Sequence, residues 1–157
     1  MTPFRALLFA GAAALMLVAQ TPTQNPTPNS YAQKLVNETL AKHPDVVILA
    51  MHVVSRNGGT DYPILASNIG RYGKKADEDD LRVIKTGQNN LEVNKTGNHF
   101  EVELPLKDVH NKTIGAVGVV FNYKPGDDKQ AMEQKAIAIR DELTAATPSA
   151  DRLYGAP

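Results

Sequence analysis

The chain has 157 residues and carries 17 basic and 17 acidic side chains, so its formal net charge at neutral pH is zero. Such a balance gives no electrostatic preference for nucleic acid or for anionic lipid, and neither is expected as a partner. The sequence contains no cysteine, which excludes disulfides, thiolate metal sites and thioether-linked haem. The fold must therefore be held by its own apolar core.

The N-terminus has the pattern of a secretory signal peptide. Arg5 supplies a positive charge, and an uncharged apolar run extends from Ala6 to Ala19. At about 14 residues this run is shorter than the about 20 that span a bilayer, but it suits the core of a signal peptide. We expect residues 1–20 to be cleaved and the mature chain, without a transmembrane span, to be periplasmic or secreted.

The remaining sequence predicts one domain between a linker and a tail. Residues 21–29 (TPTQNPTPN) form the linker, because three prolines and no apolar side chain favour an extended chain. The polar tail over 144–157 contains two prolines and is expected to be disordered. Between them, the expected elements are helix 30–43, strands 45–55 and 62–67, short helix 76–85, strands 90–94, 99–106 and 113–123, and helix 127–143.

Helix boundaries follow from capping residues. Ser30 with Gln33, and Asp127 with Gln130, have the spacing of capping boxes. Asp77 suits the N-cap of the short helix, and the acidic residues after it suit the positive end of the helix dipole. Gly87 is expected to end that helix.

Strand patterns predict positions in a sheet. Segments 45–55 and 113–123 are apolar on both faces, which is typical of central strands. Segment 99–106 (HFEVELPL) alternates strictly, which predicts an antiparallel strand with its polar face in water. The fold class is therefore α+β, with a central antiparallel sheet of about five strands, helices at both ends and a short helix over the sheet.

This order of elements resembles that of the extracytoplasmic PAS-like, single Cache domain family. Two segments carry the resemblance, Ile64 to Gly87 (ILASNIGRYGKKADEDDLRVIKTG) and Phe100 to Lys129 (FEVELPLKDVHNKTIGAVGVVFNYKPGDDK). They resemble a strand, loop and acidic helix cap, and a final strand pair with its following helix. In membrane sensors of this family the terminal helices continue into the membrane, whereas here the start has the pattern of a cleavable signal.

The resemblance implies a ligand on the concave face of the sheet, under the loop and the short helix. Arg71 is the best carboxylate anchor, because a guanidinium group can bind a carboxylate bidentately. The alternative is that Arg71 belongs to a solvated basic loop. Carried onto this chain, the implied ligand-binding residues are Met51, His52, Ser67, Asn68, Arg71, Tyr72, Arg82, Phe121 and Tyr123.

Two histidine patterns have a structural alternative. His52 could contact a ligand or haem, but a histidine in an apolar strand is more often hydrogen-bonded in the core. His99, Glu101 and Glu103 share one strand face and could hold a metal, but a solvent-facing strand gives the same pattern. We therefore predict neither a metal nor a cofactor.

No catalytic motif is present, since G-x-S-x-G, H-E-x-x-H and the P-loop are all missing. The sequence favours a non-catalytic domain that binds or senses a small molecule, and Arg71 suggests a ligand that carries a carboxylate. Two alternatives stay open: a protein-interaction module that forms a homodimer through its N-terminal helix, and an unrecognised secreted hydrolase.

Overall fold

The computed structural model describes residues 29–157, so the expected signal peptide over 1–20 and nearly all of the linker lie outside the described residues. The order of elements is the predicted one, with a short helix added at the end. The elements are α1 (Tyr31–Lys42), β1 (Val46–Val53), β2 (Ile64–Ser67), α2 (Glu78–Thr86), β3 (Asn90–Val93), β4 (His99–Lys107), β5 (Thr113–Asn122), α3 (Lys129–Ala145) and α4 (Ala150–Leu153).

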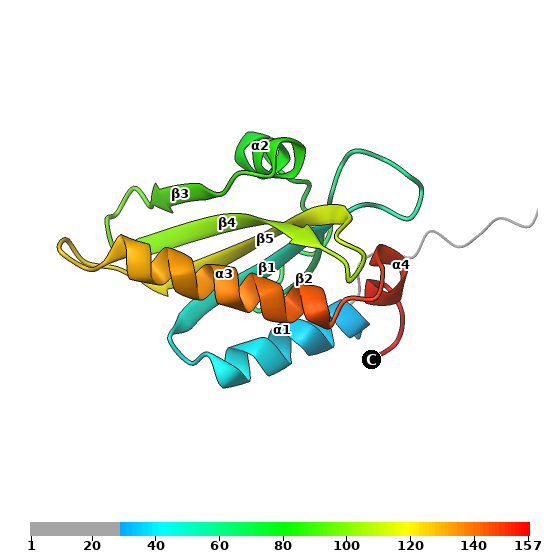
Figure 1. Ribbon diagram of the computed structural model, residues 1–157, viewed down its shortest axis with the longest axis horizontal. Coiled ribbons are helices and arrows are strands. Elements are labelled where there is room, and N and C mark those ends of the chain that lie inside the picture. The colour runs from blue at the N-terminus through cyan, green and yellow to red at the C-terminus, as the bar shows by residue number, and fades with distance from the viewer. Residues whose placement is uncertain (1–28) are drawn as a thin grey trace, which may run out of the picture.

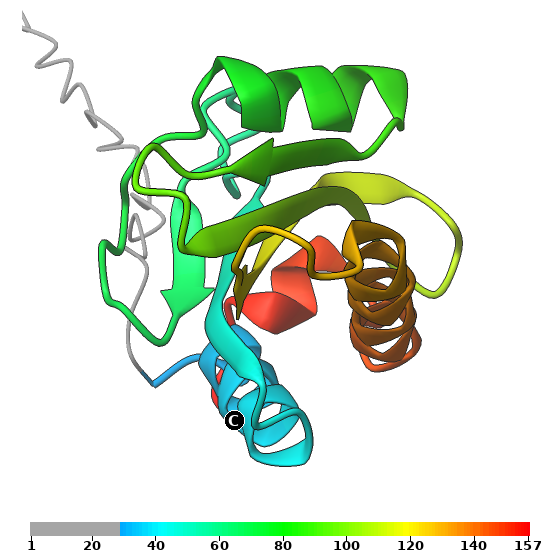
Figure 2. The same ribbon diagram turned by 90° about the vertical axis from the view of Figure 1, so that its left-hand side faces the viewer.

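The five strands form one antiparallel sheet in the order β2-β1-β5-β4-β3. The two strands predicted to be central, β1 and β5, lie beside each other away from both edges. Helices α1, α3 and α4 cover one face of the sheet, whereas α2 lies over the other (Figures 1 and 2). The predicted α+β class and five-stranded sheet are confirmed.

The main core fills the space between the sheet and helices α1 and α3. Leu49 and Met51 of β1, and Phe100 and Leu104 of β4, are each no more than 1% exposed and pack there with α3 residues such as Ile139. Because side chains alternate along a strand, the neighbouring positions of β1 and β4 point to the face under α2. The position of each polar residue therefore follows from the parity of its strand.

Most of the predicted caps hold. Asp77 and Asp80 form a capping box at the start of α2, and Gly87 ends α2 with a φ of 71°, a left-handed conformation that favours glycine. Ser30 accepts a hydrogen bond from the Gln33 amide, but the Gln33 side chain contacts other groups and does not complete the box. The N-cap of α3 is Asp128, one residue after the predicted cap.

The expectation that the tail over 144–157 is disordered is wrong, because this segment contains helical structure. Helix α3 extends to Ala145, α4 follows, and Leu153 of α4 is fully buried in the core. The Tyr154 hydroxyl donates to the carbonyl of Val54, and the Thr147 hydroxyl donates to the carbonyl of Leu143. A polar segment can be ordered in this way by one buried apolar side chain together with local and long-range hydrogen bonds.

Among residues 29–157, no helix is long and apolar enough to cross a membrane.

Candidate functional site

The face of the sheet under α2 is lined by small side chains at its centre and by carboxylates at one side. Ala50, Ala116 and Gly118 lie on the central strands β1 and β5, and Glu103 of β4 pairs directly with Gly118. A Cβ on Gly118 would lie 2.9 Å from Oε1 of Glu101, so this glycine leaves the room that the Glu101 carboxylate occupies. The sequence therefore places two carboxylates of β4 against a floor without bulky side chains.

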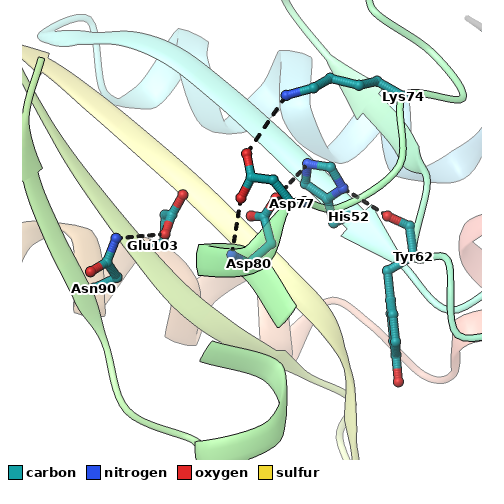
Figure 3. Close-up of polar contacts among 7 residues, drawn as sticks. All are labelled: His52, Tyr62, Lys74, Asp77, Asp80, Asn90 and Glu103. Atoms are coloured by element: carbon teal, nitrogen blue, oxygen red, sulfur yellow. Dashed lines mark hydrogen bonds and ion pairs between the residues drawn. The ribbon is translucent and has the colours of Figure 1, made fainter. Parts of the chain in front are cut away.

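His52 is 6% exposed and connects the sheet to α2 and to the loop between β1 and β2 (Figure 3). Its Nδ1 lies 2.7 Å from the carbonyl oxygen of Tyr62, and its Nε2 lies 3.4 Å from Oδ2 of Asp80. A carbonyl only accepts, so Nδ1 must carry a proton. The other ring nitrogen, Nε2, faces the carboxyl group of Asp80 within ion-pair distance. His52 is thus a buried histidine held by hydrogen bonding within the chain, which is the structural alternative expected from the sequence.

Three carboxylates gather between α2 and the sheet. One oxygen each of Asp77, Asp80 and Glu103 lies within 4.8 Å of the others. Each already has a partner: Asp77 contacts Lys74 at 3.8 Å, Asp80 contacts His52, and Glu103 accepts a 2.9 Å hydrogen bond from Asn90 (Figure 3). The chain itself satisfies these groups, so their proximity does not require a metal ion.

Burial changes the titration of this cluster. Desolvation raises the pKa of Glu103 from 4.5 to about 7, with the charges of Asp80 and Glu101 adding to the rise and the Asn90 hydrogen bond opposing it. Burial also raises the pKa of Asp80, against the opposing effect of His52. The expected wet face of β4 is therefore wrong at Glu103, which is 8% exposed, because α2 packs over this face.

A groove lies on the same face of the sheet, where Glu101 is two residues before Glu103 on β4. It has a volume of 170 Å³. Ile48 and Val120, which pair with each other across β1 and β5, give it an apolar floor. Its polar lining comes from Glu92, Asn94, His99 and Glu101 of the β3 and β4 region.

Glu101 is the groove residue with the most unusual environment. Its carboxylate is partly buried and makes no hydrogen bond or ion pair with any residue from 29 to 157. Burial, followed by the charges of Asp80 and Glu92, raises its pKa. Its oxygens still reach solvent, since Thr144 Oγ1 is the only buried side-chain polar atom without a hydrogen-bond partner among the described residues. A polar group of a ligand in the groove could therefore take the place of the water that hydrates this carboxylate.

Two other cavities lie elsewhere on the described residues. The first, of 470 Å³, is larger and more open, and Lys85 is the charged residue that lines it, with Tyr62, Leu81 and Ile84 among the others. The second, of 320 Å³, lies between the β1 and β5 ends and α3, beside the Asp45–Lys135 ion pair. Neither is lined by two carboxylates and a histidine as the groove at Glu101 is, and convergent polar groups of this kind are typical of ligand sites.

The structure separates the predicted ligand-binding residues into groups. Met51 and Phe121 lie in the main core on the opposite face from His52. Tyr123 packs at the edge of that core, where Lys129 lies 5.2 Å from its ring centroid. These three residues do not line the groove, because their parity along β1 and β5 directs them toward α1 and α3.

Ser67, Asn68 and Tyr72 contact the chain near β2 and α1. The Asn68 side chain accepts from the amide of Leu49 and donates to the carbonyl of Val47, so it extends the pairing of β1 beyond the end of β2. The Ser67 amide and the Tyr72 hydroxyl both donate to Oε1 of Gln33. These contacts give the three residues a structural role away from the groove.

The two predicted arginines are both exposed. Arg71 lies in the loop before α2 with a φ of 61°. Arg82 lies on α2, where it pairs with Asp79 at 2.7 Å and donates to Asn90. Neither lines the groove, and only His52 among the nine predicted residues faces the cluster beneath α2.

The residues that form the groove and the cluster are not among the predicted ligand-binding residues. The sequence places Glu101 and Glu103 on one strand face with His99, and the alternation of this strand predicts that this face is exposed to solvent. The signal that distinguishes them is Gly118, a small residue on the strand that pairs with β4, opposite their side chains.

No protein-family model matches the sequence, and no curated protein matches it either. The fold is similar to that of solved GAF domains. The GAF domain of A. aeolicus nlh2 in an inactive state has a TM-score of 0.52 at 17% identity, covering 73% of this chain and 83% of that one. A putative GAF sensor protein from Burkholderia vietnamiensis has a TM-score of 0.51 at 12% identity, covering 79% and 78%.

A third similar structure is an enzyme, the type II free methionine-R-sulfoxide reductase from Thermoplasma acidophilum. Its TM-score is 0.54 at 11% identity, covering 80% of this chain and 93% of that one. At these identities the likeness concerns the fold alone. It supports a PAS-like, GAF-type architecture, and the Cache assignment stays a prediction.

Proposed function

We propose that this chain is an exported, non-catalytic domain that binds a small molecule in the groove on the face of the sheet that α2 covers in part. The observation that carries the proposal is the groove itself, in which an apolar floor meets the partnerless carboxylate of Glu101. The similarity to a GAF domain and a GAF sensor protein supports this reading as an analogy of fold.

The dimensions of the groove favour a small ligand. Drug-sized molecules occupy cavities of about 300–1,000 Å³, and this groove has 170 Å³. The carboxylate-bearing ligand suggested by Arg71 stays a prediction that the groove does not favour. Arg71 is exposed in a loop outside the groove, and the charged groups that line the groove, Glu92 and Glu101, are acidic.

A non-catalytic role rests on the sequence, in which the catalytic motifs sought are missing. Burial raises the pKa values of Asp80, Glu101 and Glu103, and such shifts occur at functional sites and in structural clusters alike. Glu103 is also covered by α2 and does not line the groove. The similarity to the sulfoxide reductase, at 11% identity, concerns the fold alone.

Filling the groove tests the proposal. We expect the free energy of unfolding to rise by about 2.7 kcal/mol at a ligand concentration 100 times the Kd, and the Ile48→Phe variant to lose this response. Val109→Phe, at an exposed loop position, is the matched control and should respond like the native protein. The measurement is a thermal-shift screen of small amines, acids and alcohols. An identical response of both variants to every hit would place the binding site elsewhere.

Export is tested separately. We expect the protein recovered from a secreting host to have lost residues 1–19 or 1–20, since the apolar run ends at Ala19. Intact mass spectrometry of the purified protein measures this directly. A mass that includes the N-terminal methionine and the apolar run would contradict the cleaved form and favour a retained anchor.

Homodimerisation through the N-terminal helix stays a prediction. The apolar stripe of α1, which includes Leu35 and Val36, packs inside the domain against the sheet. A dimer through this helix would have to use the polar side of α1.

A further inference from the structure

We propose that the ligand of the groove is a small organic cation, such as a protonated primary amine, with its ammonium group at Glu101 and its apolar part on Ile48 and Val120. This inference rests on the proposed function and names the ligand class for the same groove.

Two acidic residues form an unfavourable cross-strand pair in the sheet. Glu92 of β3 and Glu101 of β4 are direct cross-strand partners, and both line the groove. Like charges opposite each other in antiparallel strands are destabilising. Natural sequences accept such local conflicts mainly at functional sites. A cation between the two carboxylates would turn this repulsion into attraction.

Glu101 has no ion-pair partner among the described residues. The described basic residue whose charge acts on Glu101 is Lys74, and Lys74 pairs with Asp77 rather than with Glu101. The neighbouring position shows the alternative: Asn90, directly opposite Glu103, satisfies that carboxylate with a 2.9 Å hydrogen bond. The chain compensates Glu103 internally and leaves Glu101 for a group from outside.

The floor of the groove is aliphatic. Ile48 and Val120 offer aliphatic surface next to the carboxylates, with Val120 directly paired with Glu101. Burying apolar ligand surface there contributes about 25 cal/mol per Å², which an inorganic ion cannot gain. The combination of carboxylate and aliphatic lining therefore favours an alkylammonium group over a metal ion.

Probes with one carbon skeleton separate charge from shape. Butylammonium, butan-1-ol, butanoate and Mg²⁺ are titrated into the native protein by calorimetry or by NMR. We expect butylammonium to bind at least about tenfold more tightly than butan-1-ol, since a charge-assisted hydrogen bond is stronger than a neutral one. Butanoate is expected to bind more weakly than butan-1-ol.

Two variants assign the charge effect to the groove. Glu101→Gln should lower the affinity for butylammonium by about ten- to a hundredfold while leaving the affinity for butan-1-ol unchanged. Glu38→Gln removes the same charge from the exposed side of α1, on the other face of the sheet, and should leave both affinities unchanged. Far-UV and near-UV circular dichroism check that both variants fold.

The outcomes distinguish this inference from the proposed function. Equal affinities for butylammonium and butan-1-ol, with Ile48→Phe abolishing both, would overturn the cationic ligand and keep the groove as a binding site. Tighter binding of Mg²⁺ than of butylammonium, lost in Glu101→Gln, would replace the organic cation by an inorganic one. Failure of every probe and of the wider screen to bind at the groove would overturn the proposed function itself.

Discussion

Replacing Gly115 by alanine is expected to lower the free energy of unfolding by at least about 3 kcal/mol. Gly115 lies on β5 opposite Val53 of β1, at the centre of the sheet. A Cβ at this position would lie 1.8 Å from the carbonyl oxygen of His52 and 2.8 Å from its carbonyl carbon. Both atoms belong to the backbone, so no side chain can move aside and the two central strands would have to separate.

Urea denaturation of the two proteins measures the effect. A loss of this size is a large share of the about 5–15 kcal/mol that stabilises a typical domain. Gly59→Ala is the matched control, because a Cβ there would only reach ordinary contact, 4.0 Å from Cβ of Ser55. That control should change stability by no more than about 0.5 kcal/mol. A Gly115→Ala variant as stable as the control would contradict the close approach of β1 and β5.

The second large effect is a pH-dependent gain of stability in Glu103→Gln. The pKa of Glu103 rises from 4.5 to about 7 on folding, mainly by burial. The folded protein therefore holds a proton that the unfolded chain releases between these pH values. The stability that this group contributes is complete below pH 4.5 and is lost as the pH rises through about 7. The difference of 2.5 pH units corresponds to about 3 kcal/mol.

Glutamine is neutral at every pH and keeps an oxygen that can accept from Asn90. We expect Glu103→Gln to be more stable than the native protein by up to about 3 kcal/mol above pH 7 and similar to it at pH 4.5. The charged groups around Glu103 are Asp77 at the N-cap of α2, Asp80 of α2 and Glu101 of β4. Glu103→Gln also removes the repulsion between Glu103 and these carboxylates, so the difference between the two urea curves reports Glu103 together with its coupling to them. A difference that does not change with pH would contradict the raised pKa.

The sheet was predictable from local patterns. The two-faced apolar segments mark β1 and β5 as central strands, and strict alternation marks β4. The boundaries of α2 follow from Asp77 and Gly87, whose cap geometry depends on a few neighbouring residues. Such features need no knowledge of the distant chain.

The candidate site was much less predictable. Met51 and Phe121 were placed beside His52, because a strand that is apolar on both faces does not reveal which face the long helices cover. The alternation of β4 likewise does not reveal that α2 covers Glu103. Contacts such as that between Ser67 and Gln33 join residues 34 positions apart, and local sequence does not encode them visibly.

The most direct test of the groove as the binding site is an NMR titration of the isotope-labelled protein with butylammonium and, separately, with butan-1-ol. Both probes should shift the backbone amide signals of Ile48, Glu101 and Val120, and butylammonium should do so at the lower concentration. Signal shifts confined to residues around the cavity at Leu81 and Lys85, or no saturable shift with either probe, would contradict a binding site in the groove at Glu101.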